Sequence, residues 1–287
     1  MNSLLTKRMK EQYELRARHY LPRRTYVIVR CDGRAFHTWT RGLERPYSPD
    51  LMNCMDAAAI ALCKEAAGAR LAYVQSDEIS LLLTDFADPK TEAWFDNCQN
   101  KIESISASIV TSAFNLAVMH RQLRPEGQGK ICGKKPNAVF DARAFVIPDF
   151  VEVENYFIDR QQDATRNSVT MLAQSFASHK QLHGKNQSAQ HEIIHAAGDN
   201  WEKHPARFKH GGVIRRQAVD YLAQEGVVHP SFFRPSGSIP IEKSNWFMDE
   251  GTPVFTRERH YLRTMIPIHW EDDLVQRIPD HRKGTTA

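Results

Sequence analysis

Two aspartates, Asp32 and Asp77, each stand at the end of an apolar run and have the residue type for binding divalent cations. Residues 26–29 are four apolar residues in a row, which predicts a strand buried on both faces, and Asp32-Gly33 predicts the turn that ends it. Asp77 and Glu78 lie between two short apolar runs, as in the turn of a β-hairpin. If these strands are neighbours, both aspartates project from one edge of a sheet. Two such carboxylates can share a pair of divalent cations about 3.5–4 Å apart, which is an arrangement used in phosphoryl transfer.

The elements that must position these aspartates follow a definite order along the chain. Apolar spacing and turn residues predict, in sequence, a basic helix, a strand, an alanine-rich helix, a hairpin, a long helix and a strand. Their expected ranges are 2–20, 26–31, 52–67, 71–83, 91–120 and 138–147. From the first strand on, this is the β-α-β-β-α-β order of the ferredoxin-like α+β fold, an antiparallel sheet with helices on one face. Polymerase palms and cyclases are built on the same core.

The long helix and the second half of the chain give weaker indications. In the long helix, apolar residues at spacings of three and four predict a buried face formed by Phe95, Cys98, Ile102, Ile105, Ile109, Ala113 and Leu116. Residues 152–181 are expected to be mostly helical. Residues 204–267 are rich in proline, glycine and aromatic residues and show little periodicity, and 279–287 resemble a frayed polar tail.

Composition sets mild limits on the class of protein. The chain has 287 residues, of which 41% are hydrophobic and 25% charged, so it has the composition of a globular protein with a sizeable core. Its net charge of +4 permits a polyanionic partner. The five cysteines form no C-x-x-C pair and predict neither a disulfide framework nor a cysteine zinc site. No run approaches the ~18 apolar residues of a membrane span, and we expect a cytoplasmic protein.

Four motifs in a fixed order show a resemblance to a known family. They are VRCDGRAFH at 29–37, QSDEIS at 75–80, FDAR at 140–143 and RQQD at 160–163. The chain resembles the tRNA-His guanylyltransferase family over about residues 25–215. Members of that family add nucleotides in the 3′ to 5′ direction, opposite to ordinary polymerases.

The resemblance implies roles for particular residues. Asp32, Asp77 and the backbone carbonyl of Gly33 match a catalytic site for two Mg²⁺ ions, and Glu78 is the adjoining catalytic acid. Nucleotide binding and 5′-end activation are implied for Arg34, Ala35, Phe36, His37, Arg45 and Ser76, and more loosely for Lys101 on the inner part of the long helix. Contact with the tRNA 5′ end is implied for Arg160, Asp163 and Asn167.

The chemistry implied uses nucleoside triphosphates as substrates and tRNA as the partner. ATP would adenylylate a 5′-monophosphorylated RNA, and the 3′-hydroxyl of an incoming GTP or other NTP would then expel AMP. An RNA with a 5′-triphosphate could skip the first step. The metals neutralise phosphate charge and align the attack, so no side-chain nucleophile is needed.

One departure from the family bears on the choice of RNA. Eukaryotic members have His-Ile-Asn-Asn where this chain has Thr165-Arg166-Asn167-Ser168, which resembles the bacterial and archaeal branch. That branch implies template-directed repair of truncated tRNA 5′ ends; the alternative is a dedicated tRNA-His guanylyltransferase. The resemblance also implies a homotetramer. We expect a palm-like catalytic domain with its N-terminal helix at 1–150, and a mostly helical tRNA-binding or oligomerisation region with a C-terminal extension at 151–287.

Three other functions compete with this interpretation. His191-Glu192-Ile193-Ile194-His195 is a literal H-E-x-x-H, the pattern of zinc hydrolases, but polar residues precede it and Trp201 stands where the extended motif needs a ligand. A non-catalytic RNA-recognition module would expose aromatic residues on its central strands, where this chain has valine and leucine. A palm-type nucleotidyl cyclase would use the same metals without RNA. Asp141 and Arg143 are expected to form a structural pair on the last palm strand.

Overall fold

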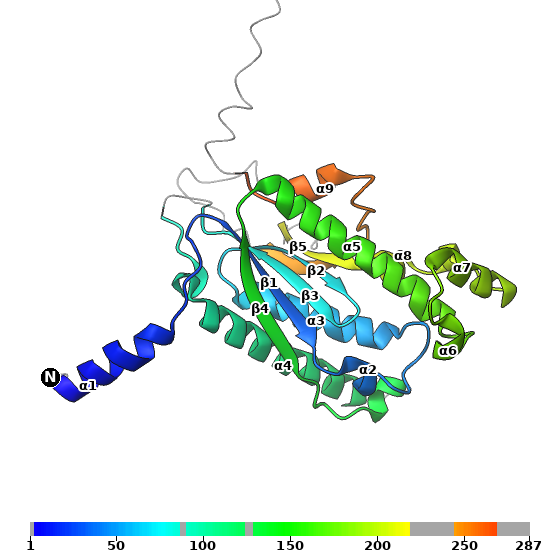
Figure 1. The fold of residues 1–287 in the computed structure, drawn as a ribbon, viewed down its shortest axis with the longest axis horizontal. Coiled ribbons are helices and arrows are strands. Elements are labelled where there is room, and N and C mark those ends of the chain that lie inside the picture. The colour runs from blue at the N-terminus through cyan, green and yellow to red at the C-terminus, as the bar shows by residue number, and fades with distance from the viewer. Residues whose placement is uncertain (1–2, 87–89, 124–128, 219–243, 269–287) are drawn as a thin grey trace, which may run out of the picture.

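A six-stranded antiparallel sheet forms the centre of the molecule (Figure 1). The computed structural model describes residues 3–86, 90–123, 129–218 and 244–268. The strand order is β4-β1-β3-β2-β5-β6. The strands are β1 Tyr26–Gly33, β2 Ala69–Gln75, β3 Glu78–Leu83, β4 Phe140–Ile147, β5 Gly212–Ala218 and β6 Ser244–Asp249.

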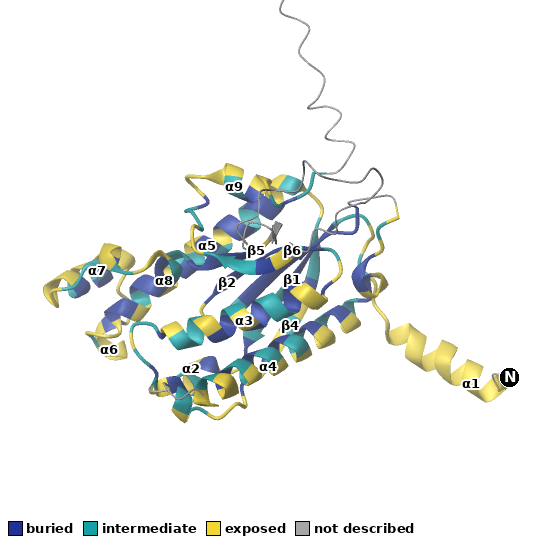
Figure 2. Cartoon of the chain, turned by 180° about the vertical axis from the view of Figure 1, so that it is seen from behind, coloured by how far each residue is buried: buried dark blue, intermediate teal, exposed yellow. Residues whose placement is uncertain are grey.

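The helices lie on both sides of this sheet. They are α1 Leu4–Met9, α2 Phe36–Trp39, α3 Pro49–Glu65, α4 Gln99–Leu123, α5 Phe150–Ala173, α6 His179–Leu182, α7 Gln187–Ala196, α8 Ala206–His210 and α9 Arg259–Arg263. Helices α3 and α4 cover one face, as Figure 2 shows from behind, and α5 crosses the other face in Figure 1. The expected order β-α-β-β-α-β is present, and its two helices, α3 and α4, lie on one face as expected. Helix α5, which follows this core, covers the opposite face.

Strand β1 is buried on both faces, as its apolar run predicts. Val29 packs toward α3 and α4 in one hydrophobic cluster, and its neighbour Ile28 packs toward Phe157 of α5 in another. Both are fully buried. Successive side chains of a strand point to opposite faces, so two helical layers demand an unbroken apolar run. The polar end of β1 then emerges at the edge of both layers.

Capping residues set the starts of the helices on each face. The Ser48 hydroxyl accepts a hydrogen bond from the Leu51 amide at 3.5 Å, and Pro49 occupies the first turn of α3. Helix α3 therefore begins three residues before the predicted position. On α5, the Asp149 carboxylate accepts from the amides of Val151 and Glu152 at 2.8 and 3.2 Å. These caps satisfy amide groups that have no partner within the helix.

Helix α4 differs from its prediction in both its start and its buried face. It begins at Gln99, because residues 95–97 have positive φ angles of 51–56° and form a separate turn. Its buried side chains are Ile102, Ser106, Val110, Phe114 and Val118. Two residues predicted to be buried, Ile105 and Leu116, are 39% and 52% exposed. Periodicity detects both apolar faces of α4, and only the packed sheet decides which one is inside.

Helix α4 is also the one helix in the described residues that is long and apolar enough, by length and composition alone, to cross a membrane. Its inner face packs in the core, against the sheet and against the neighbouring helix α3. Core helices of globular proteins pass the same test of length and composition.

The chain beyond residue 210 adds two strands that the sequence did not indicate. Strand β5 pairs with β2, and β6 pairs with β5. The following segment returns to α5, where Gln161 donates to the Pro253 carbonyl at 2.9 Å and accepts from the Phe255 amide at 2.7 Å. The region after residue 150 is thus helical up to α8 and then joins the central sheet.

Candidate active site

Asp32 and Asp77 come together at the end of β1. Asp32 is the register partner of Glu78, so the turn that contains Asp77 lies beside Gly33. The Gly33 amide donates to the Asp77 carbonyl oxygen at 3.2 Å. A Cβ on Gly33 would lie 2.9 Å from Asp77 Oδ2 and would collide with the Phe36 ring. The absence of a side chain at Gly33 therefore lets the Asp77 carboxylate approach the backbone of β1.

Both carboxylates have a raised pKa in the folded protein. The pKa of Asp77 is raised to about 6, first of all by burial; a hydrogen bond from Ser76 opposes the rise, and the charges of Asp32 and Glu78 add to it. Burial, and then the neighbouring charge of Asp141, raise the pKa of Asp32. Among the described residues, neither carboxylate forms an ion pair with a lysine or arginine. The charges of Arg30 and Arg143 act in the opposite direction on Asp32 but do not cancel the rise. Two partly buried carboxylates held close without a direct ion pair favour a bound cation.

A cavity of about 540 Å³ opens beside this acidic pair. Its walls come from Gly33, the segment 35–52, the hairpin turn, α5 and α8. Its lining includes the apolar side chains of Phe36, Met52 and Phe208 and the cationic side chains of Arg41 and Arg45. The volume is in the range of small-molecule and cofactor sites. Apolar surface for a ring next to cations and acids suits a nucleotide.

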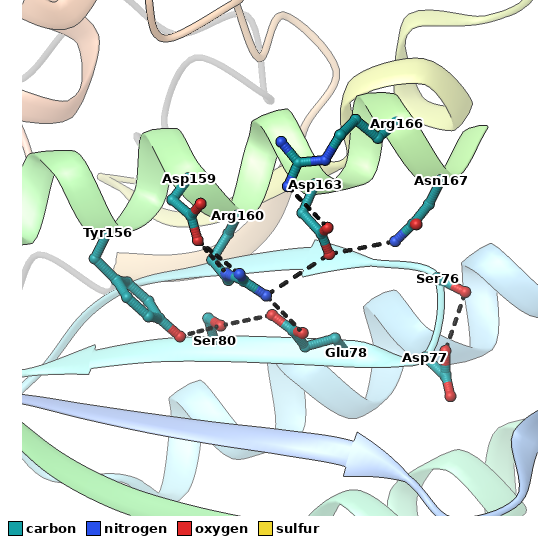
Figure 3. Close-up of polar contacts among 10 residues, drawn as sticks. All are labelled: Ser76, Asp77, Glu78, Ser80, Tyr156, Asp159, Arg160, Asp163, Arg166 and Asn167. Atoms are coloured by element: carbon teal, nitrogen blue, oxygen red, sulfur yellow. Dashed lines mark hydrogen bonds and ion pairs between the residues drawn. The ribbon is translucent and has the colours of Figure 1, made fainter. Parts of the chain in front are cut away.

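Glu78 is held away from this acidic pair by α5 (Figure 3). Arg160 Nη1 lies 3.4 Å from Glu78 Oε2 and 3.7 Å from Asp163 Oδ2. Ser80 donates to Glu78 at 3.2 Å and shares a 2.9 Å contact with the Tyr156 hydroxyl. In Figure 3, Asp77 points away from α5 at the end of the hairpin. Glu78 thus links the hairpin to α5, and of the three acids Asp32, Asp77 and Glu78 only Asp77 lines the cavity, with Asp32 beside it at the end of β1.

The predicted nucleotide-binding residues divide into two groups. Ala35, Phe36, His37, Arg45 and Ser76 line the cavity. Arg34 does not; its backbone amide donates to Val139 at 2.8 Å and its side chain is exposed. Lys101 lies in the first turn of α4, exposed, with its ammonium 5.8 Å from the centre of the Phe95 ring. The expectation that Lys101 lies on the inner part of the helix is wrong, because α4 turns a different face to the core.

The residues predicted to contact the tRNA 5′ end lie along one side of α5. Arg160 reaches Glu78, and Asn167 donates to Asp163 at 3.3 Å. Asn167 also lines the cavity. The structure therefore brings this second group of residues to the same acidic edge as the first, although about 80 residues separate them in sequence.

Sequence reasoning missed Arg207, which reaches the cavity from α8. Its Nη2 forms a 2.6 Å ion pair with Asp56 of α3, and its Nη1 donates to the Val74 carbonyl at 3.0 Å. It thereby ties α8 to α3 and to the strand that leads into the Asp77 turn. No local pattern marks Arg207, because its partners are separated from it by more than 130 residues.

Replacing Arg207 by methionine is expected to lower the free energy of unfolding by about 2–3 kcal/mol, because it leaves the largely buried Asp56 carboxylate without its partner. The side chains of the pair are only 20% and 15% exposed. Urea denaturation measures the change. Arg166→Met, which breaks a half-exposed pair with Asp163, is the matched control and should cost below about 1 kcal/mol. Equal losses in the two variants would contradict the buried-pair interpretation.

The H-E-x-x-H segment lies on α7, away from the lining of the cavity. His191 packs edge-on against the Trp201 ring, with ring centres 5.9 Å apart, and Glu192 and His195 are exposed. Within the described ranges, no group of three His, Cys, Asp or Glu side chains is close enough to hold one metal ion. Asp141 and Arg143 approach to 3.7 Å on β4, as expected for a pair.

The fold and the site together define a class of protein: an antiparallel α+β sheet whose edge holds two unpaired carboxylates beside a nucleotide-sized cavity. Comparison with known proteins makes the class specific. The profile of the tRNA-His guanylyltransferase family matches residues 6–148. The chain is 35% identical to a bacterial tRNA(His) guanylyltransferase-like protein solved with ATP, with a TM-score of 0.75, over 92% of this chain and 100% of that one.

Two further relatives agree with this match. A structure described as a bacterial tRNA(His) guanylyltransferase-like protein with GTP gives 33% identity and a TM-score of 0.72, over 93% of this chain and 100% of that chain. The tRNA(His) guanylyltransferase of Schizosaccharomyces pombe is 29% identical over 73% of this chain and 80% of its own length. The chain belongs to the tRNA-His guanylyltransferase family, a family of nucleotidyltransferases.

Proposed function

We propose that this protein adds nucleotides to the 5′ end of tRNA in the 3′ to 5′ direction, with Mg²⁺ at Asp32 and Asp77. The observation that carries the proposal is the pair of unpaired carboxylates beside a cavity that also presents arginines. The relatives solved with ATP and with GTP support nucleoside triphosphates as the substrates. The family supports tRNA as the acceptor.

The donor set fits Mg²⁺. Asp32, Asp77 and the carbonyl of Gly33 offer only oxygen ligands, and few of them, which suits an ion that keeps several waters and shares substrate phosphates. Burial first, and then neighbouring carboxylates, raise the pKa of both side chains, so their negative charge is unfavourable without metal and a bound cation would stabilise it. Bound there, Mg²⁺ would neutralise phosphate charge and polarise the phosphorus–oxygen bonds.

The side chains around the cavity bind and orient the nucleotide. Arg45, His37 and Ser76 supply donors for phosphate oxygens, and Phe36 supplies apolar surface for the base or ribose. Arg160 holds Glu78 and Asp163 in one network on α5, beside the acidic pair. We assign Arg160, Asp163 and Asn167 to the RNA 5′ end, because their helix forms the wall of the cavity that faces the hairpin.

The proposed reaction has two displacements at phosphorus. An oxygen of the RNA 5′-monophosphate attacks the α-phosphorus of ATP, and pyrophosphate leaves. The 3′-hydroxyl of the incoming nucleotide then loses its proton and attacks the 5′ phosphorus of the RNA, and AMP leaves with the electrons of the broken bond. Neither step needs a protein nucleophile, so the side chains act by positioning and by electrostatics.

The order of the elements and the sequence of α5 also bear on the architecture and on the choice of RNA. The element order β-α-β-β-α-β supports a ferredoxin-like palm, with residues 1–150 as the catalytic part. The segment Thr165–Ser168 supports templated repair over obligatory guanylate addition to tRNA-His. We further propose a homotetramer in the cytoplasm, in which residues after 150 help to hold tRNA and subunits.

An extension assay tests the function. Purified full-length protein is incubated with Mg²⁺, ATP and labelled nucleotides on a 5′-monophosphorylated tRNA that lacks its first nucleotide, and on full-length tRNA-His. We expect template-matched extension of the truncated RNA, loss of extension in Asp32→Ala and in EDTA, and no loss in the matched control Glu192→Ala. Addition of G confined to tRNA-His would indicate a dedicated guanylyltransferase. Tight RNA binding without extension would overturn the enzymatic proposal.

A further inference from the structure

Gln75, the last residue of β2, has a buried side-chain amide in the wall of the cavity. The residue is 5% exposed and lines the cavity beside Asp77. Within the part of the chain that the structure describes, no residue forms a hydrogen bond with this amide. Its atoms are nevertheless accessible, since the fully enclosed atoms without a partner belong to Ser106 and to three arginines. A buried amide without a partner costs free energy, so Gln75 indicates a polar ligand in the cavity.

The amide lies on the α5 side of the sheet. Side chains alternate along a strand, and Tyr73, two residues earlier, packs in the cluster that contains Phe157 of α5. The register partner of Gln75 is Glu78, whose carboxylate contacts Arg160 on the same helix (Figure 3). Gln75 therefore points toward α5 from the strand that leads into the acidic turn.

Small residues line the cavity on the side that Gln75 faces. They are Ala164 and Ser168 of α5 and Gly211 at the end of α8. A Cβ on Gly211 would lie 2.6 Å from Cζ of Tyr73, so the backbone at Gly211 passes closely over the end of β2. The absence of large side chains here leaves space for a ligand group next to the amide.

The chemistry of the amide narrows the choice of ligand group. A primary amide offers donors and an acceptor, which match a hydroxyl group or the edge of a nucleobase. A phosphate oxygen only accepts, so it would leave the amide oxygen without a partner, and the arginines of the cavity wall suit phosphate better. The proposed function requires both ATP and GTP or another NTP. Their base edges differ in donors and acceptors, whereas their riboses are identical, so a contact that all of them can make is one to the ribose.

We propose that the Gln75 amide binds the ribose 2′-hydroxyl of the nucleoside triphosphate in the cavity and thereby favours ribonucleotides over deoxyribonucleotides. The 3′-hydroxyl is the attacking group of the proposed reaction, whereas the 2′-hydroxyl takes no part in the displacement and is free to be held. The Cα atoms of Gln75 and Asp77 are at most about 7 Å apart, so the amide can reach the ribose of a nucleotide whose phosphates lie at Asp77. The assignment rests on the proposed binding of nucleotides in this cavity.

Calorimetric titration of the full-length protein with nucleotides in Mg²⁺, without RNA, tests the assignment. We expect wild type to bind 2′-deoxy-ATP about 5- to 10-fold more weakly than ATP, which is the effect of one hydrogen bond, and to bind 3′-deoxy-ATP as tightly as ATP. Gln75→Leu nearly keeps the size of the side chain and removes the amide. This variant should bind ATP about 5- to 10-fold more weakly than wild type does, and it should no longer distinguish ATP from 2′-deoxy-ATP.

Two controls separate ribose binding from a change in the fold. Gln174→Leu alters an exposed glutamine that also lines the cavity, and it should keep the preference for ATP. In urea denaturation without nucleotide, Gln75→Leu should have a midpoint no lower than that of wild type, because leucine replaces a buried amide that has no partner. A lower midpoint would mean that the amide supports the fold and would overturn the assignment.

The titrations also distinguish this assignment from the proposed function. Equal binding of ATP and 2′-deoxy-ATP by wild type would overturn the assignment and leave nucleotide binding in the cavity intact. A preference for ATP that persists in Gln75→Leu would overturn it too, because another residue would then hold the 2′-hydroxyl. If wild type bound no ATP, both the assignment and the proposed use of this cavity for nucleotides would be wrong.

Discussion

Asp77→Asn is expected to lower nucleotide transfer more than about 1,000-fold while making the metal-free protein more stable. The loss of activity follows if Asp77 binds Mg²⁺. The gain in stability follows from burial, which raises the pKa of Asp77 from 3.8 to about 6 in the folded protein. The folded state therefore binds this proton more tightly than the unfolded state does. The cost of the charged side chain therefore grows as the pH rises above about 4 and is complete above about 6.

The sign and size of that effect can be measured. A shift of about two pKa units corresponds to roughly 3 kcal/mol at most, lost as the pH rises from 4 through 6. In EDTA, the free energy of unfolding of Asp77→Asn should exceed that of wild type at pH 7.5, and the difference should shrink toward pH 4. Mg²⁺ should stabilise wild type but not the variant.

Asp199→Asn provides a control of opposite sign. The Asn200 amide donates to Asp199, and this hydrogen bond holds the pKa of Asp199 below its usual range. Its charge therefore stabilises the fold above pH 4, and removing it should lower stability at pH 7.5. If Asp77→Asn also lowered stability in EDTA, or kept near-normal transfer, Asp77 would be a structural acid and not the metal ligand we propose.

Phe114→Ala is expected to lower the free energy of unfolding by about 3–5 kcal/mol, the largest single loss we expect in the core. Phe114 is fully buried on α4, and its ring centre lies 5.5, 5.2 and 5.3 Å from those of Phe36, Trp39 and Phe140. The substitution leaves a cavity in the middle of this aromatic cluster. Because Phe36 also lines the cavity beside Asp77, nucleotide transfer should weaken as well.

Urea denaturation checks this prediction against a matched control. Phe176→Ala removes the same side chain from a position that is 44% exposed, and it should cost below about 1.5 kcal/mol. Phe114→Leu keeps most of the volume and should fall between the two. Similar losses for Phe114→Ala and Phe176→Ala would mean that α4 turns a different face to the sheet than the structure has.

Short-range patterns predicted much of the fold. The apolar run at 26–29, the hairpin around Asp77 and the order of the first six elements follow from the alternation of apolar and polar residues and from turn chemistry, which act over a few residues. The helix ends predicted from the sequence are less accurate. Apolar spacing predicts a helix that includes residues 95–97, because nothing in their side chains signals the positive φ angles that separate them from α4.

Local sequence patterns are sufficient to identify the two aspartates of the site and the strands that end beside them. Asp32 and Asp77 follow strands that could be recognised locally, and Asp32-Gly33 indicates where the first of these strands ends. The tertiary structure decided the rest. In the folded chain, the inner face of α4 contains Phe114 and not Ile105, and β5 and β6 extend the sheet. Glu78 contacts Arg160, and Arg207 pairs with Asp56. These choices depend on contacts between residues far apart in the chain, whose free energies no local pattern records.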